Sequence, residues 1–143
     1  MEAAGEVLRL TSLRVKRKIT GVYLTREVVE ALLTAAKEVH PREFLLLLRG
    51  KVKGDKLFVE ELVVPPLATY GLGFASFNPY LLPLDPSIIG VAHSHPSGLA
   101  KPSLEDLDHF MGYVVVIVAY PYASPSDIHA YLANGIEVGF EVL

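Results

Sequence analysis

The most constraining stretch of this chain is the uninterrupted apolar run from Tyr113 to Tyr120. Val114 to Val118 are all β-branched, which disfavours a helix and leaves no alternation of polar and apolar positions. A strand with one face in water needs that alternation, whereas a strand covered on both faces does not. The run therefore predicts a buried central strand.

Six further segments have the composition of strands: Arg14–Leu24, Phe44–Val52, Lys56–Val64, Ile88–His93, Asp127–Ala133 and Ile136–Val142. The pairs Gly54-Asp55 and Asn134-Gly135 predict hairpin turns, the second of type I′. Between Thr25, a typical N-cap, and Pro41, which cannot continue a helix, apolar residues recur at helical spacing. We expect an α/β (α+β) chain with a central mixed sheet flanked by helices.

Composition sets broad limits on the class of protein. The 143 residues, 51% of them hydrophobic, predict a single domain over 1–143, and the absence of cysteine excludes disulfides. No segment has the pattern of a signal peptide and no apolar run approaches about 18 residues, so we expect a cytoplasmic protein without a membrane segment. A mean hydropathy of +0.37 favours an apolar self-association surface and a homodimer.

A net charge of −3 gives no general attraction to phosphate, so we expect no nucleic acid as a partner. The basic run Arg14–Lys18 is interpreted as the solvated side of an edge strand.

Residues 93–106, His-Ser-His-Pro-Ser-Gly-Leu-Ala-Lys-Pro-Ser-Leu-Glu-Asp, have the pattern of a metal site. His93 and His95, two apart on a strand, point to the same face and can share one ion. Pro96 and Gly98 turn the chain, and Ser103 as an N-cap brings Asp106 back towards the histidines. Two imidazoles and a carboxylate suit zinc and leave a fourth position for water. An alternative is that Ser103 and Asp106 form only a capping box.

The whole segment resembles the signature H-x-H-P-x-G-x-x-x-P-S-x-x-D of the JAMM, or MPN-plus, metalloproteases, with every fixed position present. The resemblance implies a cytidine-deaminase-like fold with the site at a strand end. It also implies one Zn²⁺ held by His93, His95 and Asp106, with Ser103 stabilising the oxyanion. His40, His109 and His129 lie outside the signature and are not expected to be ligands.

The family also has an upstream catalytic glutamate, for which Glu43 is the candidate, between the predicted helix and a strongly apolar strand. Glu38, Glu60 and Glu61 are alternatives, but Glu38 falls within the helix and the other two follow a hairpin turn. One departure from the family pattern is Leu46, where many members have glycine. The lack of cysteine argues against a second, structural zinc.

The resemblance implies a zinc isopeptidase that cuts after the C-terminal Gly-Gly of a ubiquitin-like modifier or sulfur-carrier protein, whose tail binds as an added strand on a sheet edge. The alternatives are a metal-free MPN scaffold, a zinc hydrolase of small peptides or amides, and a DNA-associated protein, since the RadC group has a similar H-x-H-P-S-G loop. Residues 65–87 carry Tyr70, Phe74, Phe77 and Tyr80, which predict either a substrate clamp or packing on the core.

Overall fold

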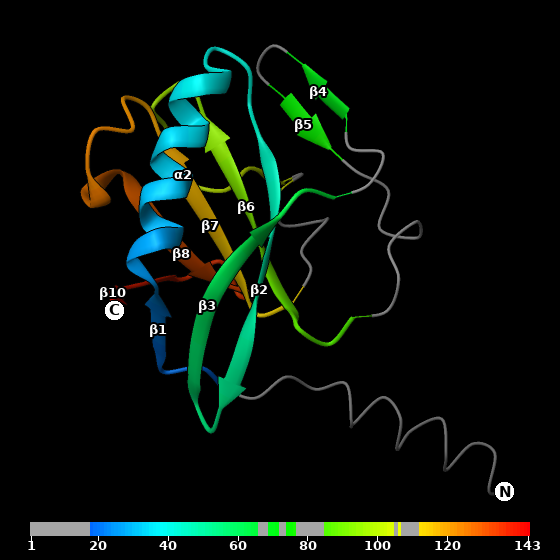
Figure 1. The fold of residues 1–143 in the computed structure, drawn as a ribbon, viewed down its shortest axis with the longest axis vertical. Helices are drawn as coiled ribbons and strands as arrows, with labels where there is room; N and C mark the ends of the chain where they lie inside the picture. The colour runs from blue at the N-terminus through cyan, green and yellow to red at the C-terminus, as the bar shows by residue number, and fades with distance from the viewer. Residues whose placement is uncertain (1–17, 66–68, 72–73, 77–84, 105, 107–111) are drawn as a thin grey trace, which may run out of the picture.

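A mixed eight-stranded sheet forms the body of the protein (Figure 1). The computed structural model describes residues 18–65, 69–71, 74–76, 85–104, 106 and 112–143. The strand order is β10-β1-β3-β2-β6-β7-β8-β9, with β1–β3, β1–β10 and β6–β7 parallel. The strands are β1 (Gly21–Leu24), β2 (Leu45–Lys53), β3 (Lys56–Val63), β6 (Ile88–His95), β7 (Val114–Ala119), β8 (Ile128–Leu132), β9 (Glu137–Val138) and β10 (Phe140–Val142). A separate hairpin pairs β4 (Thr69–Gly71) with β5 (Phe74–Ser76).

The predicted central strand is confirmed. All six residues of β7 are buried, and β7 pairs with β6 on one side and β8 on the other. Gly90 makes the close approach of β6 possible, because a Cβ at this position would lie 2.3 Å from the Val114 carbonyl oxygen. The protein core is therefore organised around β6 and β7.

Helix α2 (Arg26–Val39) covers one face of the sheet (Figure 1). The Thr25 hydroxyl accepts a hydrogen bond from the Val28 amide at 3.2 Å, which confirms the predicted N-cap. The helix ends at His40, whose ψ of 135° lies outside the helical range, directly before Pro41. The buried side of α2 packs into the larger of two apolar clusters, and the smaller cluster lies on the opposite face of the sheet, around Leu45, Val91 and Ile117.

Several predicted boundaries were wrong. The segment Ile136–Val142 is not one strand: it divides at Gly139 into β9, which pairs with β8, and β10, which pairs in parallel with β1. The turn before it is not type I′, which requires positive φ at both central residues, since only Gly135 has a positive φ and Asn134 does not. Strand β6 continues two residues past the predicted end and so contains both histidines of the motif.

Other predictions fall on parts of the chain that are not described. Of the predicted strand Arg14–Leu24, residues 14–17 lie outside the described residues, and the strand itself begins at Gly21, between β10 and β3. Within the described residues, the helical elements are α2, the short 3-10 helix η2 (Pro125–Asp127) and the helical positions Leu104 and Asp106. The aromatic side chains of the 65–87 segment also lie outside what is described. None of the described helices has the length and apolar character required to cross a bilayer.

Candidate metal centre

The start of β2 and the end of β6 are joined side by side, and this junction builds the site. Leu45 is the Cα partner of His93 in the antiparallel ladder. One residue beyond the ladder, the Ser94 hydroxyl accepts a hydrogen bond from the Phe44 amide at 2.8 Å, and the Ser94 amide donates to the Phe44 carbonyl at 3.3 Å. Glu43 is thereby placed beside both histidines. The sequence analysis missed Ser94, because its bond to the Phe44 amide joins residues that are 50 positions apart in the chain.

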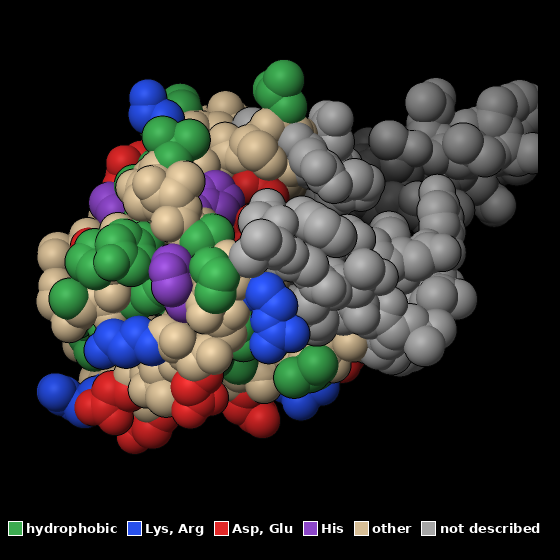
Figure 2. All heavy atoms as spheres, turned by 90° about the horizontal axis from the view of Figure 1, so that it is seen from above, with side chains coloured by type: hydrophobic (Ala, Val, Ile, Leu, Met, Phe, Trp, Pro, Cys, Tyr) green, Lys and Arg blue, Asp and Glu red, His purple; other side chains and the backbone are tan. Residues whose placement is uncertain are grey.

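Three side chains of the motif and the upstream Glu43 converge at this strand end. The closest contact is 3.1 Å between His95 Nε2 and Asp106 Oδ2, and His93 Nε2 lies 3.5 Å from Asp106 Oδ1. Glu43 Oε1 lies 3.8 Å from His93 Nδ1 and 4.0 Å from His95 Nε2. All four residues are buried, with between 4% and 9% of their surface exposed. Figure 2 views this end of the molecule from above, where histidine and acidic side chains lie beside one another.

The loop after β6 sets the orientation of His95. The His95 carbonyl accepts hydrogen bonds from the Gly98 and Tyr120 amides, both at 3.1 Å, and Gly98 completes the turn with a φ of 83°. The ring nitrogen Nδ1 of His95 lies 2.9 Å from the Leu99 carbonyl, to which it can only donate. That bond directs Nε2 inwards and is the type of outer contact that fixes a metal-binding histidine. Tyr131 of β8 holds the same loop by donating to the Ala100 carbonyl.

The capping box is present, and it is part of the cluster. The Ser103 hydroxyl accepts from the Asp106 amide at 3.0 Å, while Asp106 Oδ2 accepts from the Ser103 amide at 2.8 Å. The same Asp106 carboxylate contacts both histidines. Asp106 can therefore act both in the helix cap and as a metal ligand. Ser103 keeps its own hydroxyl hydrogen to donate.

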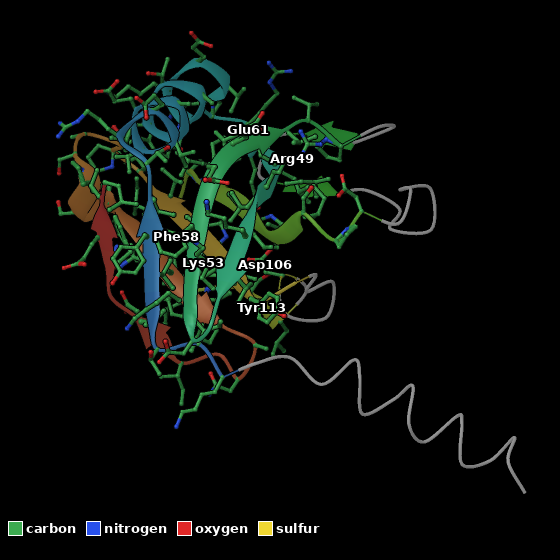
Figure 3. All side chains as sticks on the ribbon, turned by 60° about the horizontal axis from the view of Figure 1, so that its bottom comes forward. Arg49, Lys53, Phe58, Glu61, Asp106 and Tyr113 are labelled. Atoms are coloured by element: carbon green, nitrogen blue, oxygen red, sulfur yellow. The ribbon has the colours of Figure 1, made fainter. Side chains whose placement is uncertain are left out.

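The alternative glutamates lie elsewhere. Glu61 pairs with Arg49 at 3.9 Å across β3 and β2, where Figure 3 labels both residues. Glu60 pairs with Lys51 at 3.5 Å, and Glu38 is exposed on α2. Among the histidines outside the motif, His129 pairs with Glu137 and His40 with Tyr122, while His109 lies outside the described residues. Of the four candidate acids, Glu43 is the one at the histidines.

The charges of the cluster are coupled. Burial raises the pKa of Asp106, but the hydrogen bond from His95 and the nearby His93 outweigh it and bring that pKa down to about 2. Burial lowers the pKa of His95, but its bonds to Asp106 and to the Leu99 carbonyl prevail and raise the pKa above 6.5. Asp106 is thus an anion at neutral pH, ready to bind a cation.

The donor set and its spacing fit zinc. Tetrahedral ligands about 2.0–2.2 Å from zinc lie about 3.3–3.6 Å from one another. Of the closest contacts in the cluster, the one at 3.5 Å lies within that range and the one at 3.1 Å lies just below it, whereas those of Glu43, at 3.8 Å and 4.0 Å, lie a few tenths of an ångström above it. Glu43, His95 and Asp106 also offer ligand atoms that all lie within 4.8 Å of one another. Three ligands and one adjacent base can therefore be drawn from these four residues.

Residues 25–133 match the family model for prokaryotic homologues of the JAB domain. The chain belongs to this family. A relative in Haloferax volcanii, described as a probable metalloprotease, is 32% identical over 134 residues, which cover 89% of this chain and 81% of the relative. The JAB fold of this chain is the JAMM/MPN fold, as two solved structures show.

The first of these structures is a JAB1/MPN domain protein from Archaeoglobus fulgidus, 33% identical, with a TM-score of 0.64 over 85% of this chain and 98% of that one. The second, described as JAMM, a metalloprotease-like zinc site in the proteasome and signalosome, is 31% identical, with a TM-score of 0.61 over 88% of this chain and 99% of that one. The likeness thus extends over nearly the full length of both solved domains.

Zinc affinity should decrease as the pH is lowered, because zinc must then displace a proton from His95 Nε2. The raised pKa of His95 makes this competition begin above pH 6.5, whereas the pKa of Asp106, about 2, keeps that carboxylate charged throughout. Below the pKa of His95 we expect the apparent affinity to fall by at least about tenfold per pH unit. Competition titrations with a chelating dye between about pH 5.5 and 8 measure this slope. A constant affinity over that range contradicts the assignment of His95 as a ligand.

Proposed function

We propose that this protein is a zinc-dependent isopeptidase that hydrolyses the bond after the C-terminal glycine of a ubiquitin-like modifier or sulfur-carrier protein. The observation that carries the proposal is the convergence of Glu43, His93, His95 and Asp106 at one buried strand end. Membership of the JAB family and a relative described as a probable metalloprotease support the hydrolytic chemistry.

In the proposed mechanism, His93, His95 and Asp106 hold the metal. When bound, zinc would lower the pKa of water strongly, to about 7, and so would supply a nucleophile at neutral pH. The Glu43 carboxylate, beside both histidines, accepts the proton of the attacking water and later delivers it to the leaving amine. The Ser103 hydroxyl donates to the developing oxyanion. The Leu99 and Ala100 carbonyls keep the loop between the ligands in place.

Burial of the site supports a slender substrate. All four polar side chains are at most 9% exposed, so the scissile bond must enter a confined space. A tail ending in two glycines has no side chains to obstruct that entry. The outer strands of the large sheet, β10 and β9, are separated from β2 and β6 by other strands, so a tail bound at the centre does not extend this sheet at its outer edge.

An apolar cavity lies between the end of α2 and the start of β2, and its lining includes the two chain neighbours of Glu43. The cavity has a volume of about 260 Å³ and is lined by Ala35, Val39, Arg42, Phe44, Leu46 and Val64. We propose that a protein substrate bound at the metal site also places an apolar side chain in this cavity. A small amide confined to the metal does not reach it.

The variant Val64→Asp should therefore raise KM for a protein conjugate by roughly tenfold, since one apolar contact is worth about 1–3 kcal/mol. Hydrolysis of a short peptide should be unchanged. Ile136→Asp is the matched control, because Ile136 is 62% exposed, Val64 is 69% exposed, and Ile136 lies at the far end of β8. Steady-state kinetics on both substrates provide the measurement. An unchanged KM for the conjugate would show that the cavity is not part of the substrate-binding surface.

Cleavage of an isopeptide-linked modifier conjugate, with and without a zinc chelator, tests the proposal directly. We expect release of the intact modifier, abolished by the chelator and restored by added zinc. Zinc-loaded protein that cleaves only short peptides supports the small-substrate hydrolase instead. A preparation that binds no zinc and cleaves neither substrate supports the scaffold, and both of these outcomes reject the isopeptidase.

A further inference from the structure

Three aromatic rings pack together beside the segment that leads to Glu43. The His40 ring stacks on Tyr120, with ring centroids 4.9 Å apart and planes at 25°. Tyr122 meets both rings edge-on at 5.6 Å. The Tyr122 hydroxyl lies 3.0 Å from His40 Nδ1. We call His40, Tyr120 and Tyr122 the aromatic brace.

The brace joins two elements that are distant in the sequence. His40 is the C-cap residue of α2, whereas Tyr120 and Tyr122 follow directly after β7. The hydrogen bond between His40 and Tyr122 spans 82 residues of chain. The brace therefore ties the end of the helix to the end of the central strand.

Tyr122 has an unusual backbone conformation. Its φ is 58°, in the left-handed region that a bulky residue seldom adopts and that surrounding contacts must maintain. The Tyr122 amide donates to the Ala119 carbonyl at 3.0 Å, and only 1% of the residue is exposed. A bulky residue held in this way directs its ring inwards. The hydroxyl at the end of that ring meets His40, which is itself exposed.

Each end of the brace is connected through the backbone to a residue of the metal centre. The Tyr120 amide donates to the His95 carbonyl at 3.1 Å, and Ala119 is the Cα partner of His95. At the other end, His40 precedes Glu43 by three residues, and β2 begins only at Leu45. Burial and then the negative charge of Glu43 raise the pKa of Tyr122, so its hydroxyl lies within electrostatic reach of that carboxylate.

We infer that Tyr122 and His40 are positioning residues whose hydrogen bond fixes residues 40–43 against the end of β7 and so sets the distance between the Glu43 carboxylate and His95. This inference rests on the proposed function, in which Glu43 moves the proton. The connection from α2 to Glu43 precedes the β2 ladder, so the brace adds a restraint on this connection outside that ladder. A base displaced by about 1 Å can lose about 100-fold in rate.

The test compares Tyr122→Phe, which removes only the hydroxyl, with His40→Ala. Each variant should lower kcat by about 10- to 100-fold at unchanged KM and unchanged zinc content. The double variant should be no slower than the worse single variant, because both changes break the same bond. His40→Asn, whose side-chain oxygen replaces Nδ1, should recover most of the rate. Tyr23→Phe is the matched control, since Tyr23 stacks on Phe58 on β1 and β3, away from the site.

Hydrogen exchange of the metal-free proteins gives a readout that does not depend on turnover. Tyr122→Phe should speed exchange over residues 40–46 by about tenfold and leave residues 114–119 unchanged. Unchanged exchange, or faster exchange with kcat within twofold of the wild type, overturns the inference. A fall in kcat without faster exchange also overturns it, because the hydroxyl would then act in the chemistry itself. If the wild type has no turnover, the proposed function fails, and the exchange experiment still decides whether the brace fixes this segment.

Discussion

Glu43→Gln is expected to bind one zinc per chain and to lose turnover by about 100- to 10,000-fold, the range that general acid–base groups contribute. Glutamine has the shape of glutamate but cannot accept the proton of the attacking water. The four contacts that hold the strand end together do not require the negative charge at this position: two join Phe44 to Ser94, and two join Asp106 to the histidines. The variant should therefore fold as the wild type does.

The measurement combines zinc content with single-turnover rates, and Glu38→Gln is the matched control on the exposed side of α2. Glu43 Oε1 lies 4.0 Å from His95 Nε2, close enough for Glu43 itself to be a ligand. In that case Glu43→Gln loses zinc together with activity. A zinc-loaded variant with full activity excludes Glu43 from catalysis altogether.

His95→Ala and Asp106→Asn should lose zinc. Loss of an outer contact to a ligating histidine typically costs about 10- to 100-fold in metal affinity, so loss of a ligand itself should cost more than about 100-fold. Asp106→Asn is the more informative variant, because its side-chain oxygen can still accept from the Ser103 amide and preserve the helix start. Its effect then reports on the negative charge.

Zinc stoichiometry and competition titration measure this effect, with His129→Ala as the control, because His129 pairs with Glu137 away from the cluster. His93→Ala decides the ligand set. If His93, His95 and Asp106 are the ligands, this variant also loses zinc. Retention of tight binding in His93→Ala would assign the third ligand position to Glu43, and retention in Asp106→Asn would refute the proposed site.

The sequence predicted the parts of the fold that depend on local pattern. The continuous β-branched run of β7 could only be a strand covered on both faces, and the cap at Thr25 and the stop at Pro41 bounded α2. The division at Gly139 was missed because β9 and β10 differ in their partners rather than in composition. Pairing between β10 and β1 is a long-range property that no local window contains.

In the candidate site, too, the features that depend on local sequence could be predicted and those that depend on long-range pairing could not. Two features could be predicted from the sequence, because each follows from a local geometric rule: the shared face of His93 and His95 on a strand, and the cap at Ser103. The approach of Glu43 was predicted only through the family resemblance, since it depends on the register that pairs Leu45 with His93. Ser94 and Tyr122 were missed, because the chain gives no local sign that a hydroxyl will anchor a distant amide or ring.

The capping box at Ser103 has a thermodynamic consequence for metal uptake. The Ser103 amide already fixes Asp106 Oδ2. The side-chain entropy of Asp106 is therefore lost when the helix start forms and not when the ion binds. By linkage, any change that strengthens this helix start should raise metal affinity, and the bound ion should in turn strengthen the helix start.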